Sequence, residues 1–134
     1  MKTHEVVAAI IIYQDKILCM QRDKGKYDYV SYKYEFPGGK VEPGETRAEA
    51  LQRELREEMA LKVAVKDEDY YMSVEHTYPD FKITMHSFIC RVESQVFERK
   101  EHIDHKWLTR EELMTLDWAP ADIPIVERLQ GESK

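Results

Sequence analysis

GGKVEPGETRAEALQRELREEMAL, from Gly38 to Leu61, is the stretch on which the fold depends. It opens with two glycines after Pro37 and continues into charged and apolar residues at helical spacing. Thr46, followed three residues later by Glu49, forms a capping box, in which each side chain satisfies a backbone N–H that has no partner within the helix. The sequence therefore predicts a helix that begins near Arg47.

The predicted helix carries two rows of side chains. Apolar residues three and four positions apart form a stripe for packing against a core: Ala48, Leu51, Leu55 and Met59. Beside it, Glu54, Glu57 and Glu58 are spaced i, i+3 and i+4, so their carboxylates converge on one patch. Each like-charge pair costs roughly 0.2–0.5 kcal/mol, and a bound cation would remove this repulsion. For an arbitrary helix the simpler alternative is a solvated acidic face with Arg53 and Arg56 as ion-pair partners.

The whole segment resembles the Nudix box of the Nudix hydrolases. Gly39 is followed after five residues by Glu45, and after seven more by RELREE at residues 53–58. Ala60 and Leu61 complete the match, although the family usually has glycine where this chain has Ala60. A glycine there suits a left-handed helix end or a close backbone contact, so alanine weakens the turn without altering the acidic residues. So many specified positions at fixed spacing are far more specific than a lone glycine motif.

The resemblance implies a fold and a metal site. The fold is α/β: a Nudix fold, an α/β/α sandwich with a mixed central sheet, formed by a single domain over residues 1–134 with the box at residues 39–61. The implied metal is Mg²⁺, which favours carboxylates, water and substrate phosphates, with Mn²⁺ as a possible substitute. The implied ligands are the backbone carbonyl of Gly38 and the carboxylates of Glu54, Glu57, Glu58 and Glu101.

The resemblance also separates structural from catalytic residues. Arg53 pairs with Glu45 and fixes the loop against the helix, and Gly39 shares this structural duty. A carboxylate must accept a proton when water attacks phosphorus. Glu54 is the first choice for this base and Glu101, from a charged loop, is the second. A solvated surface glutamate is the alternative for Glu101.

Three residues are predicted to contact substrate. Arg22 stands where similar enzymes place a substrate-contacting arginine, and Lys40 directly follows the glycines, where it can reach a phosphate. Asp122 stands where oxidised-guanine enzymes of the family have asparagine. A carboxylate accepts from the exocyclic amine of cytosine but donates only when protonated, so an oxidised purine would require a raised pKa at Asp122. The alternative for Asp122 is a helix N-cap. In the loop 23–33, a stacking wall of tyrosines competes with ordinary half-buried aromatics, the simpler interpretation.

The remaining sequence predicts strands around this helix. Residues 5–13 are too continuously apolar for a half-exposed strand and indicate a central one, paired in a hairpin with residues 16–21. His86 is interpreted as a hydrogen-bonded core histidine. Further expected elements are strands at 34–37, within 62–76, at 81–93 and at 105–108, a short helix at 109–116 and a last helix from 119 to about 130.

Composition limits the partners. The 134 residues carry a net charge of −6, which argues against a nucleic-acid polymer, because binding of such a polymer relies on lysine and arginine. Cys19 and Cys90 lie in apolar runs and indicate reduced core residues, as in the cytoplasm. We expect no membrane span and no signal peptide, and a monomer or homodimer that binds a small nucleotide.

The resemblance is greatest to the MutT-like branch of the family, through EFPGGKVEPGE and PADIPIVERL. It implies a Mg²⁺-dependent nucleoside triphosphate pyrophosphohydrolase that releases nucleoside monophosphate and pyrophosphate, with CTP-type or oxidised substrates such as 8-oxo-dGTP. Another Nudix activity, on ADP-ribose or dinucleoside polyphosphates, would keep the same metal ligands. A non-catalytic nucleotide-binding domain would require a degraded box, and every acidic position here is intact.

Overall fold

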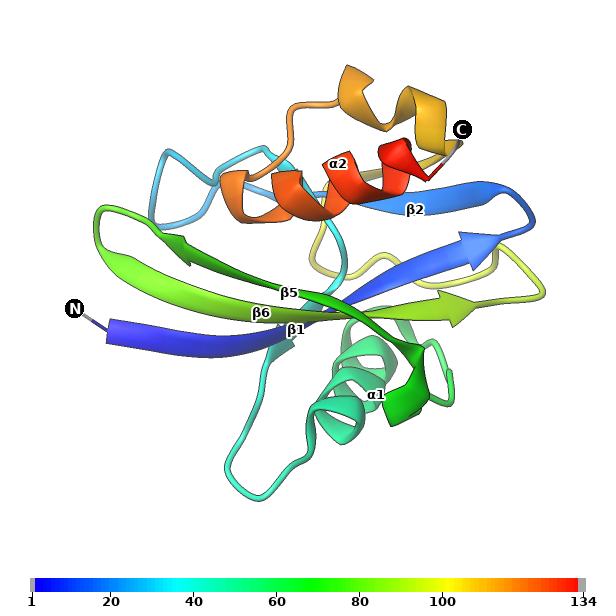
Figure 1. The fold of residues 1–134 in the computed structure, drawn as a ribbon, viewed down its shortest axis with the longest axis horizontal. Coiled ribbons are helices and arrows are strands. Elements are labelled where there is room, and N and C mark those ends of the chain that lie inside the picture. The colour runs from blue at the N-terminus through cyan, green and yellow to red at the C-terminus, as the bar shows by residue number, and fades with distance from the viewer. Residues whose placement is uncertain (1, 133–134) are drawn as a thin grey trace.

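The computed structural model describes residues 2–132, so Met1, Ser133 and Lys134 of the predicted domain lie outside the described residues. A seven-stranded mixed sheet has the strand order β3-β2-β1-β6-β5, with β4 paired to β1 and β7 paired to β2. Figure 1 shows α1 on one side of this sheet and α2 on the other. The predicted α/β/α sandwich with a mixed sheet is therefore confirmed.

The strands are β1 (Lys2–Tyr13), β2 (Lys16–Gln21), β3 (Tyr34–Glu35), β4 (Gly38–Lys40), β5 (Tyr70–Thr77), β6 (Phe81–Arg91) and β7 (Asp104–Leu108). The helices are α1 (Arg47–Met59) and α2 (Ile123–Gly131), with 3₁₀ turns η1 (Asp67–Asp69), η2 (Arg110–Thr115) and η3 (Pro120–Asp122). Among the described residues, no helix is long and apolar enough to cross a membrane.

β1 is the central strand, as its sequence predicts. Its buried residues alternate between two cores: one includes the apolar stripe of α1, and the other includes α2. The residues facing α1 are Val7, Ala9 and Ile11, and those in the second core are Ala8, Ile10 and Ile12. β1 pairs in parallel with β6 from Lys2↔Phe81 to Ile12↔Arg91. Both faces of β1 are covered, which explains its uninterrupted apolar sequence.

The other edge of β1 changes partner along its length. It pairs with β4 at Val6, Val7 and Ala8 and then with β2 at Ile12 and Tyr13. Between these pairings, the N–H of Ala9 donates to the carbonyl of Pro37 at 2.8 Å. The chain thus passes from β3, which pairs with β2, to β4 across a break in the sheet edge.

α1 begins and ends as expected. The Glu49 N–H donates to Thr46 Oγ1 at 3.1 Å, and the Thr46 N–H donates to Glu49 Oε1 at 2.8 Å, so both halves of the capping box are present. The helix ends at Met59 and is capped by Ala60, whose φ of 51° and ψ of 33° are left-handed. The backbone geometry usually served by glycine is therefore kept here by an alanine.

Several expected elements differ in detail. The residues 38–40 form a short strand, which is not among the expected strands, because they pair with β1. Within 62–76 only β5 is a strand. Val65 N–H donates to the side-chain oxygen of Gln52 at 2.7 Å, so this N–H bonds to the helix and not to a neighbouring strand. The predicted helix at 109–116 is the 3₁₀ turn η2, and a 3₁₀ turn, η3, precedes the last helix.

The isolated side-chain predictions in the cores are confirmed. Cys19 and Cys90 are both buried and unpaired. His86 is buried, and its Nδ1 lies 2.6 Å from the Ser73 hydroxyl. Cys19, His86 and Cys90 are buried, and none of them lines the pocket described next.

Candidate active site

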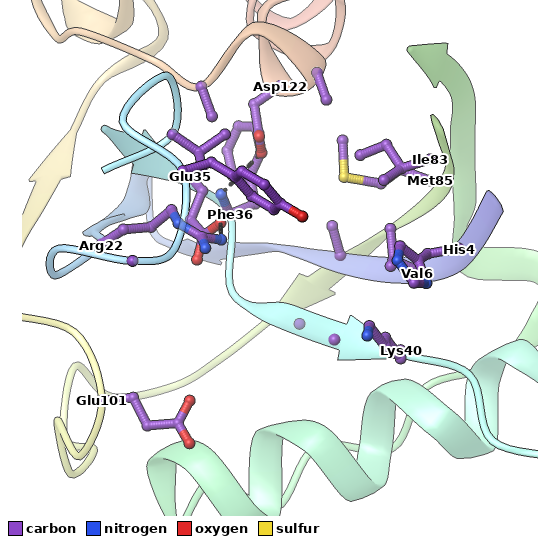
Figure 2. Close-up of a pocket in the computed structure, with 18 of the residues that line it drawn as sticks. His4, Val6, Arg22, Glu35, Phe36, Lys40, Ile83, Met85, Glu101 and Asp122 are labelled. Atoms are coloured by element: carbon purple, nitrogen blue, oxygen red, sulfur yellow. Dashed lines mark hydrogen bonds and ion pairs between the residues drawn. The ribbon is translucent and has the colours of Figure 1, made fainter. Parts of the chain in front are cut away.

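A pocket of about 580 Å³ opens where β1 changes its partner. It has two chemically different ends: Figure 2 shows Glu101 on the α1 side of β4 and Phe36, Met85 and Asp122 on the other side of β1. The carboxylate end is formed by Gly38, Gly39, Lys40, Glu58 and Glu101. The apolar end is formed by Phe36, Tyr78, Phe81, Ile83 and Met85, with Asp122 among them.

Glu58 is the most strongly perturbed acid of the carboxylate end. Burial raises its pKa to about 9, and repulsion from Glu101 and Glu54 adds to the shift. Its Oε2 atom is buried and has no hydrogen-bond partner. A buried carboxylate oxygen without a partner is costly, so this atom is available to a ligand that carries positive charge.

Both glycines are required by close contacts. A Cβ atom on Gly39 would overlap the carboxyl group of Glu54, with Oε1 only 2.7 Å away. A Cβ atom on Gly38 would overlap the carbonyl oxygen of Val7 and lie 2.9 Å from the Cα atom of Ala8. The double glycine therefore lets β4 lie between β1 and the carboxylate of α1.

Arg53 organises the acidic residues of the box. Its Nε donates to Glu45 Oε2 at 2.6 Å and its Nη2 to Glu45 Oε1 at 3.0 Å, so the pair that the resemblance implies is present as a bidentate contact. Nη1 donates to Glu54 at 2.9 Å and to Glu57 at 3.2 Å. Nη2 also donates to the carbonyl of Lys40 at 3.0 Å, which joins the helix to β4.

The carboxylates predicted to bind metal do not all face the pocket. Glu58 and Glu101 line the pocket, and Glu54 lies against Gly39. The side chain of Glu57 is 59% exposed and pairs with Arg53, as the solvated-face alternative expects. Within residues 2–132, no three His, Cys, Asp or Glu side chains are close enough together to hold a metal ion as they stand.

The donor chemistry nevertheless fits a hard divalent cation. The groups available are carboxylate oxygens and a backbone carbonyl, the ligands that Mg²⁺ takes in proteins. The partnerless Glu58 Oε2 and the repulsion among Glu54, Glu58 and Glu101 would both be relieved by such an ion. Soft thiol ligands are not available here, because Cys19 and Cys90 are in the cores.

Asp122 is the polar group of the apolar end. It is only 5% exposed, and its Oδ1 accepts a hydrogen bond from the Phe36 N–H at 3.1 Å. Burial, reinforced by Glu35, holds the pKa of Asp122 well above its usual value, while the Phe36 N–H and Arg22 oppose the shift. Asp122 occupies the N-cap position of α2, but its side chain makes no capping hydrogen bond there.

Arg22 lines the pocket and belongs to a partly buried group of polar side chains that the sequence did not predict. Arg22 Nη1 donates to Glu35 Oε1 at 3.0 Å, and the second oxygen of Glu35 lies 2.9 Å from His102 Nε2. Glu35 is adjacent to Phe36 in the quoted EFPGGK segment, but nothing local indicates its partner, because 67 positions separate it from His102. The contact of His102 with a carboxylate therefore has no signal in the local sequence.

The tyrosines in and just after the loop 23–33 differ in whether they lie near the pocket. Tyr27 lines it, and Tyr29 stacks between Tyr27 and Tyr78, with ring centroids 5.2 Å apart on each side. Tyr32 is 51% exposed, and the buried Tyr34 donates its hydroxyl to Asp104 at 3.0 Å. A stacking surface therefore exists, but Tyr78 and not Tyr32 or Tyr34 continues it into the apolar end.

Comparisons with known proteins agree with this arrangement. A NUDIX domain model matches residues 2–129. The chain is 39% identical over 127 residues to the CTP pyrophosphohydrolase of Escherichia coli (strain K12), covering 95% of this chain and 91% of that protein. It is 29% identical over 131 residues to the 8-oxo-dGTP diphosphatase of the same organism, covering 97% of this chain and 98% of that protein.

Solved structures give the same result. The solution structure of MutT, a Nudix hydrolase from methicillin-resistant Staphylococcus aureus 252, matches with a TM-score of 0.75 and 39% sequence identity. The match covers 98% of this chain and 99% of that one. Similarity therefore extends over both ends of the pocket and is not confined to the box.

Proposed function

The chain belongs to the Nudix hydrolase family, and from this we propose that it is a nucleoside triphosphate pyrophosphohydrolase. Its proposed substrates are (d)NTPs of the CTP type or oxidised nucleotides such as 8-oxo-dGTP, split into nucleoside monophosphate and pyrophosphate. The supporting observation is the pocket itself, which joins a carboxylate end to an apolar end in a volume of about 580 Å³, within the usual range of small-molecule sites.

We propose a division of labour along this pocket. Nudix hydrolases generally use a divalent metal, and Mg²⁺, replaceable by Mn²⁺, is the ion that the oxygen donors here fit best. The proposed ligands are the Gly38 carbonyl, Glu54, Glu57, Glu58 and Glu101. When bound, the metal would supply charge neutralisation for the phosphates and activation of a water molecule.

The protein's own groups would position the reacting atoms. Glu54 is our first candidate for the base that accepts a proton, because Gly39 and Arg53 hold its carboxyl group in place. Glu101, which also lines the pocket, is the second. Lys40 lies at the carboxylate end, where its ammonium group would contact a phosphate oxygen.

The Asp122 side chain could recognise either cytosine or an oxidised purine, depending on its protonation state. A carboxylate accepts from the exocyclic amine of cytosine, whereas a protonated carboxyl group can also donate, as an oxidised purine would require. The raised pKa of Asp122 favours the protonated form, and Arg22 lies within the same pocket wall. The base preference therefore depends on the protonation state of one buried side chain.

The proposed partner is a small nucleotide and not a nucleic-acid polymer, since the net charge is −6. The buried, unpaired Cys19 and Cys90 fit a reducing compartment such as the cytoplasm.

A product-release assay tests the proposal. Purified protein is incubated with CTP, dCTP, GTP, dGTP, 8-oxo-dGTP and ADP-ribose, with and without Mg²⁺, and pyrophosphate, orthophosphate and nucleotide products are identified. We expect Mg²⁺-dependent pyrophosphate release, fastest with cytosine or 8-oxoguanine nucleotides. Preferential hydrolysis of ADP-ribose or release of orthophosphate from the triphosphates would refute it.

A further inference from the structure

His102 has a buried side chain in an otherwise largely exposed loop between β6 and β7. The segment between β6 and β7 is attached by backbone bonds at two points near its end: the Glu98 N–H donates to the Met59 carbonyl at 2.9 Å, and the Ile103 N–H donates to the Gln21 carbonyl at 3.0 Å. Between these attachments lie the exposed Glu101 and the adjacent His102, whose side chain is only 8% exposed.

The buried imidazole holds a specific partner. Because a carboxylate only accepts hydrogen bonds, the His102 Nε2–H donates to Glu35 Oε2 at 2.9 Å. Glu35 belongs to β3, where it pairs with Met20 of β2, so it is fixed by the sheet. Its other oxygen is held by Arg22 at 3.0 Å. The imidazole therefore ties the loop to a rigid wall of the pocket.

The neighbouring Glu101 extends to the carboxylate end. It lines the pocket together with Glu58, and the two carboxylates lie close enough for Glu101 to repel negative charge on Glu58. Figure 2 shows the Glu101 carboxyl group on the α1 side, apart from Glu35 and Arg22. Two consecutive residues thus connect two parts of the pocket: Glu101 lies at the carboxylate end with Glu58, and His102 contacts Glu35 of the Arg22–Glu35 pair.

We propose that His102 is a positioning residue: its hydrogen bond to Glu35 fixes the backbone from which Glu101 reaches the carboxylate end. This inference rests on the proposed function of Glu101. A second tie on this loop, between Arg99 Nη1 and His105 Nδ1 at 2.9 Å, is more exposed and does not line the pocket. The His102–Glu35 hydrogen bond is therefore the one of these two contacts that lies in the pocket and directly beside Glu101 in the chain.

The first test measures the loop without metal or substrate. Amide hydrogen exchange is compared in the wild type, His102→Leu and His102→Gln, since the glutamine amide can replace the Nε2–H donor. We expect about 10-fold faster exchange over residues 99–103 in His102→Leu, near wild-type exchange in His102→Gln and no change in α1. Equal exchange in the wild type and His102→Leu would overturn the anchoring role.

The second test measures kinetics at saturating Mg²⁺ with the best substrate from the product-release assay. His102→Leu should lower kcat about 10- to 100-fold, as removing residues that support ligands typically does. KM should change much less, and His102→Gln should recover most of the loss. In the double variant Glu35→Gln/His102→Leu, the loss should be smaller than the product of the single losses, because the two side chains share one hydrogen bond.

Two further variants separate the possible failures. His86→Leu removes another buried, hydrogen-bonded histidine outside the pocket and should leave kcat and exchange over 99–103 unchanged. Glu101→Gln tests the proposed function: an unchanged kcat would refute a role for Glu101, while hydrogen exchange would still decide the anchoring. If Glu101→Gln lowers kcat and His102→Leu does not, the positioning role is refuted.

Discussion

The two ends of the pocket differ in how far apart their residues lie in the sequence. Most of the carboxylate end comes from one continuous segment, from Gly38 to Glu58, joined only by Glu101. The apolar end joins residues from distant segments; the bond between Phe36 and Asp122 spans 86 positions. Proposed chemistry is thus placed on a local motif, whereas proposed recognition depends on the complete sheet. The two ends should therefore respond differently to substitution.

The largest expected effect is at the carboxylate end. If Glu57 leaves Arg53 to bind metal, Glu57→Gln should lower kcat by roughly 100-fold or more, since even groups that only support ligands are worth 10- to 100-fold. Its thermal unfolding should remain close to the wild type. Steady-state kinetics with a Mg²⁺ titration measures the loss.

Glu127→Gln, on the exposed face of α2, is the matched control and should be neutral. If Glu57 serves only as the partner of Arg53 at 3.2 Å, kcat will not change and only a small loss of stability will follow. That outcome would restore the solvated-face interpretation for Glu57.

At the apolar end, Asp122→Ala should change selectivity more than rate. One base-edge contact is worth about 1–3 kcal/mol, so the ratio of kcat/KM between cytosine and oxidised-guanine triphosphates should shift about 10-fold. Competition between the two substrates in one reaction measures this ratio directly. An equal loss on all bases would make Asp122 a purely structural residue.

Asp122 should also make stability depend on pH. An ordinary aspartate has a pKa of about 3.9, and that of Asp122 is raised in the folded protein. Its contribution to stability is therefore fully present below about pH 4 and is lost as pH rises toward the folded pKa, because the unfolded chain ionises first.

Asparagine cannot ionise but retains the acceptor for the Phe36 N–H. The free energy of unfolding of Asp122→Asn relative to the wild type should therefore increase between about pH 4 and pH 7. Urea unfolding of both proteins across this range is the measurement. Parallel curves would show that Asp122 is ionised when folded.

The smallest effect is expected at the end of α1. Ala60 has a φ of 51°, a region that costs a non-glycine residue about 1–2 kcal/mol. Ala60→Gly should therefore increase the free energy of unfolding by about 0.5–1 kcal/mol, since glycine also has more freedom when unfolded. Ala50→Gly, inside the same helix, should have the opposite sign in chemical denaturation. Destabilisation by both would show that Ala60 is not strained.

The same difference between the ends explains what the sequence could predict. The capping box, the apolar stripe and the left-handed residue of α1 are decided by neighbours within a few positions. The contact of Arg53 with Glu45 is also local, spanning eight positions. Continuous hydrophobicity likewise identified β1 as a doubly covered strand.

The remainder depends on contacts that no local pattern encodes. Glu35 meets His102 only because β3 pairs with β2 and because Gln21 of β2 holds Ile103, the last residue of the segment before β7. The sequence around Val65 is typical of a strand, but the Val65 N–H donates to the side chain of Gln52 on α1. The direction in which Glu57 points is equally undetermined by helical spacing, because Arg53 competes for its carboxylate.

The parallel pairing of β1 with β6 also has a consequence for the order of folding. Lys2 pairs with Phe81, 79 positions later (81 − 2), so that edge of β1 has no partner until the chain beyond Phe81 is available. Closing so long a loop slows folding. During synthesis on the ribosome the isoleucine run at residues 10–12 would emerge well before its partner, and this early segment is where transient protection by a chaperone would matter most.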